Sequence, residues 1–378
     1  MTEGAQAGAL PTMPQLDALR AFAVFAVMYQ HFTGGRWLDY FPTARLGVQL
    51  FFVLSGFLIT AILLVARERI ASGESRLFEV RQFYARRFLR IFPLYYGVVI
   101  SSAIIGIPGF RGPLLWHLGY MTNIENAITG MFPGATAHLW TLSVEEQFYF
   151  FWPWVILFVP QRWLFSVLCA AAATGPLFRF ALFISGASNM ALYTLTPSSF
   201  DAFGFGALLA LARQRQQIAG DNQLRRRLTR LGLIIGVPAV AITFWSISWP
   251  GHYYWVFAIG ANLASSFLFI WLIDRSADGF HGPIGRVLTW PPILFAGKIS
   301  YGLYVFHFIM FYSGLKRLLT WPIFRGLNHI MTWPGVTFLT LSAMTFSAAS
   351  LSWFLYERPL LNLKRFFPYT RNRTQRTP

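Results

Sequence analysis

The sequence has 378 residues, of which 55% are hydrophobic, 18% aromatic and only 12% charged, and its mean hydropathy is +0.49. A soluble globular domain carries about twice this charged fraction, so the composition excludes that class. The net charge of +17 does not indicate a nucleic-acid partner, because the basic residues form short clusters between apolar runs. The single cysteine, Cys169, excludes a disulfide framework and a cysteine-based metal site, and we expect no metal.

Long apolar runs separated by charged loops are typical of an all-α polytopic membrane protein. We expect about ten transmembrane helices and one re-entrant or interfacial segment at 112–135, where glycines and prolines interrupt the apolar run. The expected spans are residues 16–33, 46–66, 91–107, 138–160, 163–185, 192–212, 231–249, 253–273, 291–313 and 334–356.

The distribution of basic residues predicts the orientation of the chain. With the N-terminus inside, the inner segments hold roughly four times as many arginines and lysines as the outer ones, so we expect both termini in the cytoplasm. The chain then divides into a cytoplasmic N-terminal segment (1–15), a transmembrane domain (16–359) and a basic cytoplasmic tail (360–378) lying on anionic headgroups. The N-terminal segment lacks the basic region of a signal peptide, so the first helix is expected to be retained.

The first predicted helix contains Arg20 near its inner end and His31 near its outer end. Eleven residues rotate the helix by a net angle of about 20°, so both side chains share one face, roughly 16 Å apart along the axis. Each residue alone could snorkel to headgroups or cap a helix. Their shared face instead indicates a polar path that runs from the inner side into the protein.

An arginine cluster, Arg86, Arg87 and Arg90, lies at the inner mouth of the third predicted helix and is followed by Tyr95. Arg86 and Arg90 are four residues apart and are expected to share a face flanked by Arg87. Guanidinium groups suit phosphates, although the positive-inside rule alone also explains such a cluster.

Two adjacent carboxylates, Glu145 and Glu146, follow Trp140 at the outer start of the fourth predicted span. The helix macrodipole alone could explain their position. A carboxylate at membrane depth needs a partner, however, and we expect His31 to pair with one of them. A histidine–carboxylate pair is what general-base activation of a hydroxyl requires.

Two further helices carry small or polar residues. Ser300, Tyr304 and His307 fall on one stripe of the ninth predicted span, although an aromatic interface belt is an alternative. In the second span, small residues such as Ser55 and Gly56 are best explained by close helix packing. A serine nucleophile at Ser55 is not favoured, because no base lies at a defined spacing from it. Asp201 and Glu357 are candidate ion-pair partners for arginines and are assigned no chemical role.

Five of these stretches, taken together, resemble the acyltransferase-3 family of integral membrane O-acyltransferases. The family's marks are an Arg and a His on the first helix, FFxxSGFL, RRxxRIxPxY, W(S/T)LSxEEQFY and SYGLYLxH. This sequence supplies RAFAVFAVMYQH, FFVLSGFL, RRFLRIFPLY, WTLSVEEQFY and SYGLYVFH in that order, between about Leu16 and Pro359.

The resemblance implies transfer of an acyl group, usually acetyl, from cytoplasmic acyl-CoA as co-substrate to a hydroxyl of a sugar or glycolipid at the bacterial inner membrane. Typical acceptors are lipopolysaccharide, exopolysaccharide, peptidoglycan, nodulation factors and macrolide sugars. It implies catalytic roles for His31, Glu145 and Glu146, binding of acetyl-CoA by Arg20, Arg86, Arg87, Arg90 and Tyr95, and supporting roles for Ser55, Trp140, Tyr301, Tyr304 and His307. Direct transfer and an acyl-histidine intermediate both stay open.

Two departures from the family pattern stand out. Many members carry an arginine before the Asp of the sixth helix, where this chain has Ser199. Many also carry an extracytoplasmic hydrolase-like domain after the last helix, so here we expect any such partner enzyme to be a separate protein. Two other functions remain as alternatives: a transporter or flippase of an anionic glycolipid or polysaccharide precursor, and a non-catalytic scaffold of an envelope synthase. The acceptor, the acyl length and the oligomeric state do not follow from the sequence.

Overall fold

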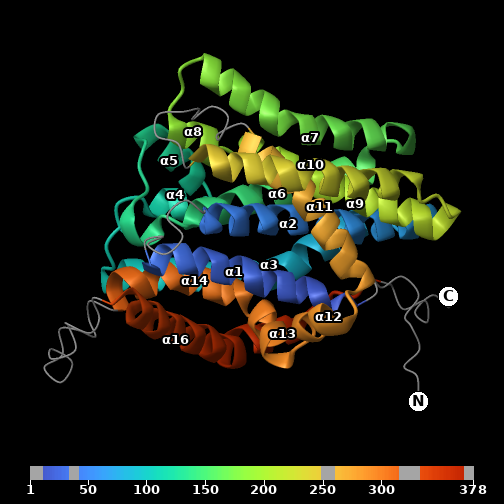
Figure 1. The fold of residues 1–378 in the computed structure, drawn as a ribbon. Coiled ribbons are helices and arrows are strands. Elements are labelled where there is room, and N and C mark those ends of the chain that lie inside the picture. The colour runs from blue at the N-terminus through green and yellow to red at the C-terminus, as the bar shows by residue number, and fades with distance from the viewer. Residues whose placement is uncertain (1–11, 34–41, 248–259, 315–332, 370–378) are drawn as a thin grey trace, which may run out of the picture.

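The computed structural model describes residues 12–33, 42–247, 260–314 and 333–369, and within these ranges the chain is helical with no strand. The long helices run roughly along one direction, with α4, α5 and α8 at one end and α12 and α13 at the other (Figure 1). They are α1 (Pro14–Thr33), α2 (Thr43–Ala71), α3 (Arg76–Ile105), α6 (Leu139–Phe158), α7 (Gln161–Ile184), α9 (Phe200–Ala219), α10 (Gln223–Ile247), α11 (Ala261–Asp278), α14 (Ser300–Ile309) and α16 (Pro334–Ser352). The short helices are α4 (Leu114–Leu118), α5 (Thr122–Thr129), α8 (Asn189–Thr194), α12 (Gly282–Leu288), α13 (Pro291–Lys298) and α17 (Arg358–Asn362).

Four helical stretches of the described chain are long and apolar enough to cross a membrane: α2, α3, α7 and Gly335–Phe366, which continues α16. A fifth results if α13 and α14, bent by 68° at their junction, count as one broken span. The prediction of an all-helical membrane protein is therefore confirmed in its coarse form, whereas ten spans are not confirmed. Interior polar residues such as Arg20 in α1 and Glu145 in α6 lower the hydropathy of the helices that carry them.

Several predicted boundaries differ from the structure. The third span was expected at 91–107, but α3 begins at Arg76, so the arginine cluster lies within the helix. The sixth was expected as one helix at 192–212 but is divided into α8, a 3-10 turn at Thr196–Ser199 and α9. Segment 112–135 holds the short helices α4 and α5 and the start of a 3-10 turn at Gly134–Thr136, as expected for a region that is not a continuous span.

Some sequence predictions fall outside the described residues. These are residues 1–11 of the N-terminal segment, 248–259 of the seventh and eighth expected spans, and 370–378 of the tail.

Helix α2 lies in the middle of the bundle, packed against α1 and α9. Its glycines allow this close approach. A Cβ built on Gly47 would lie 2.4 Å from the carbonyl oxygen of Ala23, and one on Gly56 would lie 2.2 Å from that of Phe203. The packing interpretation of Gly56 and its neighbours is thus confirmed, because small residues let two backbones approach within a membrane.

A buried ion pair joins α7 to α9. Nη2 of Arg179 lies 2.8 Å from Oδ2 of Asp201, and both side chains are completely buried. Asp201 therefore has the arginine partner that was considered for it. The guanidinium comes from α7 rather than from position 199, where many family members carry their arginine.

Candidate active site

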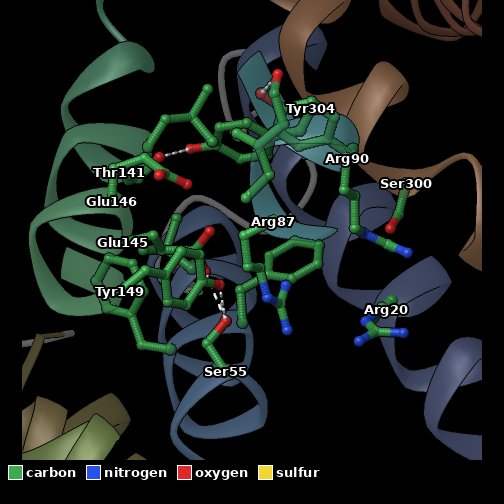
Figure 2. A pocket seen from close by; sticks show the side chains of 16 residues that line it. Arg20, Ser55, Arg87, Arg90, Thr141, Glu145, Glu146, Tyr149, Ser300 and Tyr304 are labelled. Atoms are coloured by element: carbon green, nitrogen blue, oxygen red, sulfur yellow. Dashed lines mark hydrogen bonds between the residues drawn. The ribbon is translucent and has the colours of Figure 1, made fainter. Parts of the chain in front are cut away.

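A cavity that is partly open to its surroundings lies between α1, α2, α3, α6 and α14. Figure 2 shows its polar side chains, with the carboxylates projecting from α6 and the guanidinium groups from α1 and α3. The lining residues are Arg20, Val48, Phe51, Phe52, Ser55, Arg87, Arg90, Ile91, Thr141, Leu142, Glu145, Glu146, Tyr149, Ser300, Tyr301 and Tyr304. Residues from all five motifs that carry the family resemblance therefore meet in one place.

The basic wall consists of Arg20, Arg87 and Arg90. Arg20 is paired with Asp17 one helical turn earlier, at 2.6 Å. The guanidinium of Arg87 lies 5.1 Å from the ring centre of Tyr149, a cation–π contact. Neither Arg87 nor Arg90 makes an ion pair with a carboxylate in the described part of the chain. The cavity thus offers two guanidinium groups whose charges are not compensated by a direct partner.

The acidic wall is organised by hydroxyl groups. Oγ of Ser55 donates a hydrogen bond to Oε1 of Glu145 at 2.9 Å and lies 2.9 Å from the hydroxyl of Tyr149. The absence of a base at a defined sequence spacing made Ser55 a poor candidate for chemistry, but the fold provides a carboxylate partner from another helix. Tyr149 was not selected from the sequence, although it ends the WTLSVEEQFY motif.

Tyr304 separates this cavity from a group of histidines. Its hydroxyl lies 2.7 Å from Oγ1 of Thr141, which ties α14 to α6 across the top of the cavity. Its ring centre is 5.2 Å from that of His307 and 5.7 Å from that of His138. Tyr301 lines the cavity as well and donates to the carbonyl oxygen of Ile91 at 3.1 Å.

The histidines are His31, His138 and His307, which we call the histidine cluster. Nδ1 of His31 lies 3.1 Å from Nε2 of His307, with the two rings stacked. His138 is packed against His307 with ring centres 4.9 Å apart. The sequence reasoning missed His138, although it immediately precedes the motif that contains Glu145.

The predicted pairing of His31 with Glu145 or Glu146 is wrong in this structure. The described hydrogen bond of the His31 ring goes to His307, and the Glu145 carboxylate is bound by Ser55. The reason is that the carboxylates and the histidines lie at different positions along the helix axes. Glu145 follows His138 by seven residues, which is about 10 Å along α6, so the carboxylates lie well below the histidine cluster.

Three other predicted site residues do not line the cavity. Arg86 turns away from Arg90 and donates to the carbonyl oxygen of Phe367 at 2.9 Å, with the ring of Tyr369 stacked on its guanidinium. Arg86 also donates to the carbonyl oxygen of Lys364 at 3.3 Å, so its guanidinium is held by the C-terminal segment and does not share the face of Arg90. This segment therefore packs on α3, whereas the tail was expected on headgroups.

Tyr95 and Trp140 have structural roles. Tyr95 is fully buried, donates to the carbonyl oxygen of His117 at 2.8 Å and stacks on Tyr120. Trp140 is not among the residues that line the cavity, and its ring packs against that of Tyr193, with centres 4.8 Å apart. Both motif residues therefore pack α3 and α6, two of the helices that form the cavity, against neighbouring segments.

The described part of the chain belongs to the class of helical membrane proteins that hold a cavity lined by arginines and carboxylates in their interior. Within this class, the chain belongs to the acyltransferase-3 family, because the family described as "Acyltransferase domain" matches residues 13–352. No solved structure matches this chain.

Curated relatives agree with this family. The peptidoglycan O-acetyltransferase OatA of Listeria monocytogenes serovar 1/2a is 25% identical over 370 residues, covering 92% of this chain and 56% of the relative. The O-acetyltransferase OatA of Staphylococcus aureus strain NCTC 8325 is 27% identical over 321 residues, covering 78% and 50%. YrhL of Bacillus subtilis strain 168 is 27% identical over 325 residues, covering 78% and 48%. The chain spans about half the length of the curated relatives it matches.

Proposed function

We propose that this protein is a membrane O-acyltransferase that moves an acyl group, acetyl by preference, from cytoplasmic acyl-CoA to a hydroxyl of a glycan or glycolipid at the outer side of the bacterial inner membrane. Both termini lie in the cytoplasm in this proposal, as the excess of basic residues in the inner segments favours. Family membership and the names of the relatives support O-acyl transfer.

The observation that carries the proposal is the pair of guanidinium groups, Arg87 and Arg90, that lack a carboxylate partner within the described chain and face a cavity. Cations placed in a protein interior without a carboxylate in direct contact are costly, so a site that keeps two of them is suited to an anionic ligand. Arginine is well matched to phosphate because its fork of N–H groups binds two oxygens at once. The phosphates of acyl-CoA fit this end of the cavity.

The proposed path continues from the arginines past Tyr304 to His31. Arg20 and His31 are roughly 16 Å apart along α1, a length that an extended pantetheine arm can bridge. The thioester would then lie beside the histidine cluster, where an imidazole can take the proton of the incoming hydroxyl. The oxygen–carbon bond forms, the carbon–sulfur bond breaks and the sulfur leaves as the CoA thiol. In the alternative two-step route, the His31 nitrogen first accepts the acyl group itself.

The acceptor is proposed by class only. The names of the Listeria and Staphylococcus relatives point to cell-envelope glycans, with peptidoglycan named for the first. The transporter alternative has no support from the family or from these relatives. Lipopolysaccharide and exopolysaccharide belong to the same class of acceptor, since each offers sugar hydroxyls.

The binding experiment uses the purified protein in nanodiscs, titrated with acetyl-CoA by calorimetry. Arg87→Ala and Arg90→Ala should each weaken binding by at least about tenfold, because each removes a charge-assisted contact of about 1.5–3 kcal/mol. Arg162→Ala is the matched control, since this exposed arginine lies outside the cavity at the start of α7.

His31→Ala separates binding from chemistry. We expect it to bind acetyl-CoA like the wild type and to release no CoA when muropeptides are added as acceptor. Wild-type protein that does not bind acetyl-CoA at millimolar concentration would overturn the proposed function. Equal weakening in the Arg162→Ala control would show that the arginine variants report only surface charge.

A further inference from the structure

The histidine cluster determines where the protons of its rings lie. Nδ1 of His307 is bonded to the backbone carbonyl oxygen of Tyr304. A carbonyl oxygen can only accept, so Nδ1 of His307 must carry a proton. In neutral His307 the other nitrogen, Nε2, is then a bare acceptor.

The protonation of the His307 ring also determines which nitrogen of His31 carries a proton. Nε2 of His307 lies 3.1 Å from Nδ1 of His31, and a hydrogen bond between two ring nitrogens needs one proton. Because His307 offers a lone pair there, His31 must donate through Nδ1. Neutral His31 therefore has a bare Nε2, and any proton that His31 takes up goes to that atom.

The third histidine does not disturb this chain of bonds. Nε2 of His138 donates to the carbonyl oxygen of Val305 at 3.1 Å, and Nδ1 of His138 has no hydrogen-bond partner among the described residues. Its ring meets that of His307 edge to face and makes no hydrogen bond to it. Phe308, whose ring centre is 4.4 Å from that of His31, fills the adjacent space and keeps the rings in place.

We propose that His307 is a positioning residue that holds His31 in the tautomer with a protonated Nδ1 and a bare Nε2, so that Nε2 of His31 receives the proton of the acceptor hydroxyl. The tautomer of His31 follows from the hydrogen bonds of the cluster, whereas the proton transfer rests on the proposed function. The hydroxyl oxygen bonds to the thioester carbon, the carbon–sulfur bond breaks, and the proton passes from the hydroxyl to Nε2 of His31 and then to the departing thiolate. In this arrangement His307 orients the base His31, a role that the sequence analysis assigned to Glu145 or Glu146.

The tautomer can be measured without any turnover. Protein labelled with ¹⁵N-histidine is reconstituted in lipid bilayers, and solid-state NMR distinguishes protonated from bare ring nitrogens. The signals of His31 among the seven histidines are identified by their loss in His31→Gln. We expect a protonated Nδ1 and a bare Nε2 at His31 in the wild type. A protonated Nε2 and bare Nδ1 at His31 would overturn the proposal even if the protein is an active acyltransferase.

Two substitutions at His307 separate positioning from folding. The amide of glutamine reaches the place of Nε2, so His307→Gln can still accept from Nδ1 of His31. The amide of asparagine reaches only the place of Nδ1, so His307→Asn keeps a donor to Tyr304 and loses the bond to His31. The exposed histidine in His281→Gln is the matched control for the spectra.

The kinetic expectations follow from this pair. With acetyl-CoA and muropeptides, His307→Asn should lower kcat by about 10²-fold, the effect of a misplaced catalytic group, with the KM for acetyl-CoA within about twofold of the wild type. His307→Gln should recover most of this loss, and the NMR tautomer of His31 should be kept in His307→Gln and mixed in His307→Asn. Equal kcat in the two variants, or an unchanged His31 spectrum in His307→Asn, would overturn the role of His307. A wild-type protein that transfers no acetyl group contradicts the proposed function while leaving the NMR result to decide the tautomer.

Discussion

At the residue scale, the contacts of Glu145 show how the cavity stabilises a buried carboxylate. Its carboxylate is held by the hydroxyl of Ser55 and lies near enough to Arg87 and Arg20 to interact with both electrostatically. These contacts stabilise a carboxylate in a water-poor interior, where an unbonded one would be costly. When it is ionised, Glu145 competes with any anionic ligand for the guanidinium groups of Arg87 and Arg20.

We therefore expect Glu145→Gln to bind acetyl-CoA more tightly than the wild type. Removing the charge of ionised Glu145 from the cavity should contribute at least about 1 kcal/mol, roughly fivefold in Kd, because two unit charges within about 15 Å interact by this much at an effective dielectric constant near 20. Glutamine keeps an oxygen that can accept from Ser55, so the fold is preserved. Calorimetry in nanodiscs measures the effect, and weaker binding by Glu145→Gln would contradict this account of the cavity.

A second prediction at this scale concerns the buried pair of Arg179 and Asp201. Arg179→Met leaves a buried carboxylate without its partner, which should lower the free energy of unfolding by about 3–5 kcal/mol. Adding Asp201→Asn removes the charge and should recover much of the loss. Thermal unfolding of the detergent-solubilised protein tests both variants, and an equal loss in the single and double variants would mean that packing rather than charge dominates.

At the element scale, the position of the cavity depends on how closely α2 packs against its neighbours. Ser55 faces the cavity while the adjacent Gly56 touches the backbone of α9, so one turn of α2 both forms the site and fixes its depth. The bend between α13 and α14 has a related effect, because Ser300 and Tyr301 enter the cavity directly after it.

Gly56→Ala should destabilise the protein by about 1–3 kcal/mol, as overpacking does, because the added Cβ meets the carbonyl oxygen of Phe203 at 2.2 Å. Gly97→Ala in α3 is the matched control. Its Cβ would have only the hydroxyl of Tyr356 nearby, at 3.7 Å, so the change should be neutral or slightly stabilising. The apparent Tm of the two variants in detergent tests this, and a Gly56→Ala protein as stable as Gly97→Ala would argue against close α2–α9 packing.

At the scale of the whole molecule, the proposed reaction requires that the two ends of the bundle face different compartments. The basic wall must be reached by acyl-CoA from the cytoplasm, and the histidine cluster must lie toward the acceptor. The positive-inside rule assigns the start of α7 to the cytoplasm and the end of α5 to the outer side.

Cysteine labelling tests this orientation. In a protein with Cys169→Ser, we expect a membrane-impermeant maleimide to label Thr129→Cys in intact cells and Arg162→Cys only after permeabilisation. Both positions are exposed, and the positive-inside rule assigns them to opposite sides of the membrane. The reversed pattern would contradict both the orientation and the direction of acyl transfer.

The sequence by itself determined the class of the fold and many of the residues that line the cavity. Long apolar runs separated by charged clusters indicated a helical membrane protein, and five motifs predicted site roles for Arg20, Arg87, Arg90, Glu145 and Tyr304, all of which line the cavity. These features are local, because a helix satisfies its own backbone hydrogen bonds and a motif lies on one or two turns.

Only the tertiary structure decided which side chains meet. It paired His31 with His307 instead of Glu145, and it directed Arg86 to the C-terminal segment. It also supplied Arg179 to Asp201 from a different helix. Such pairings depend on the relative depth and rotation of helices. A shift of one turn moves a side chain by about 5.4 Å, and many close contacts along each helix set that shift together, so no single stretch of sequence encodes it.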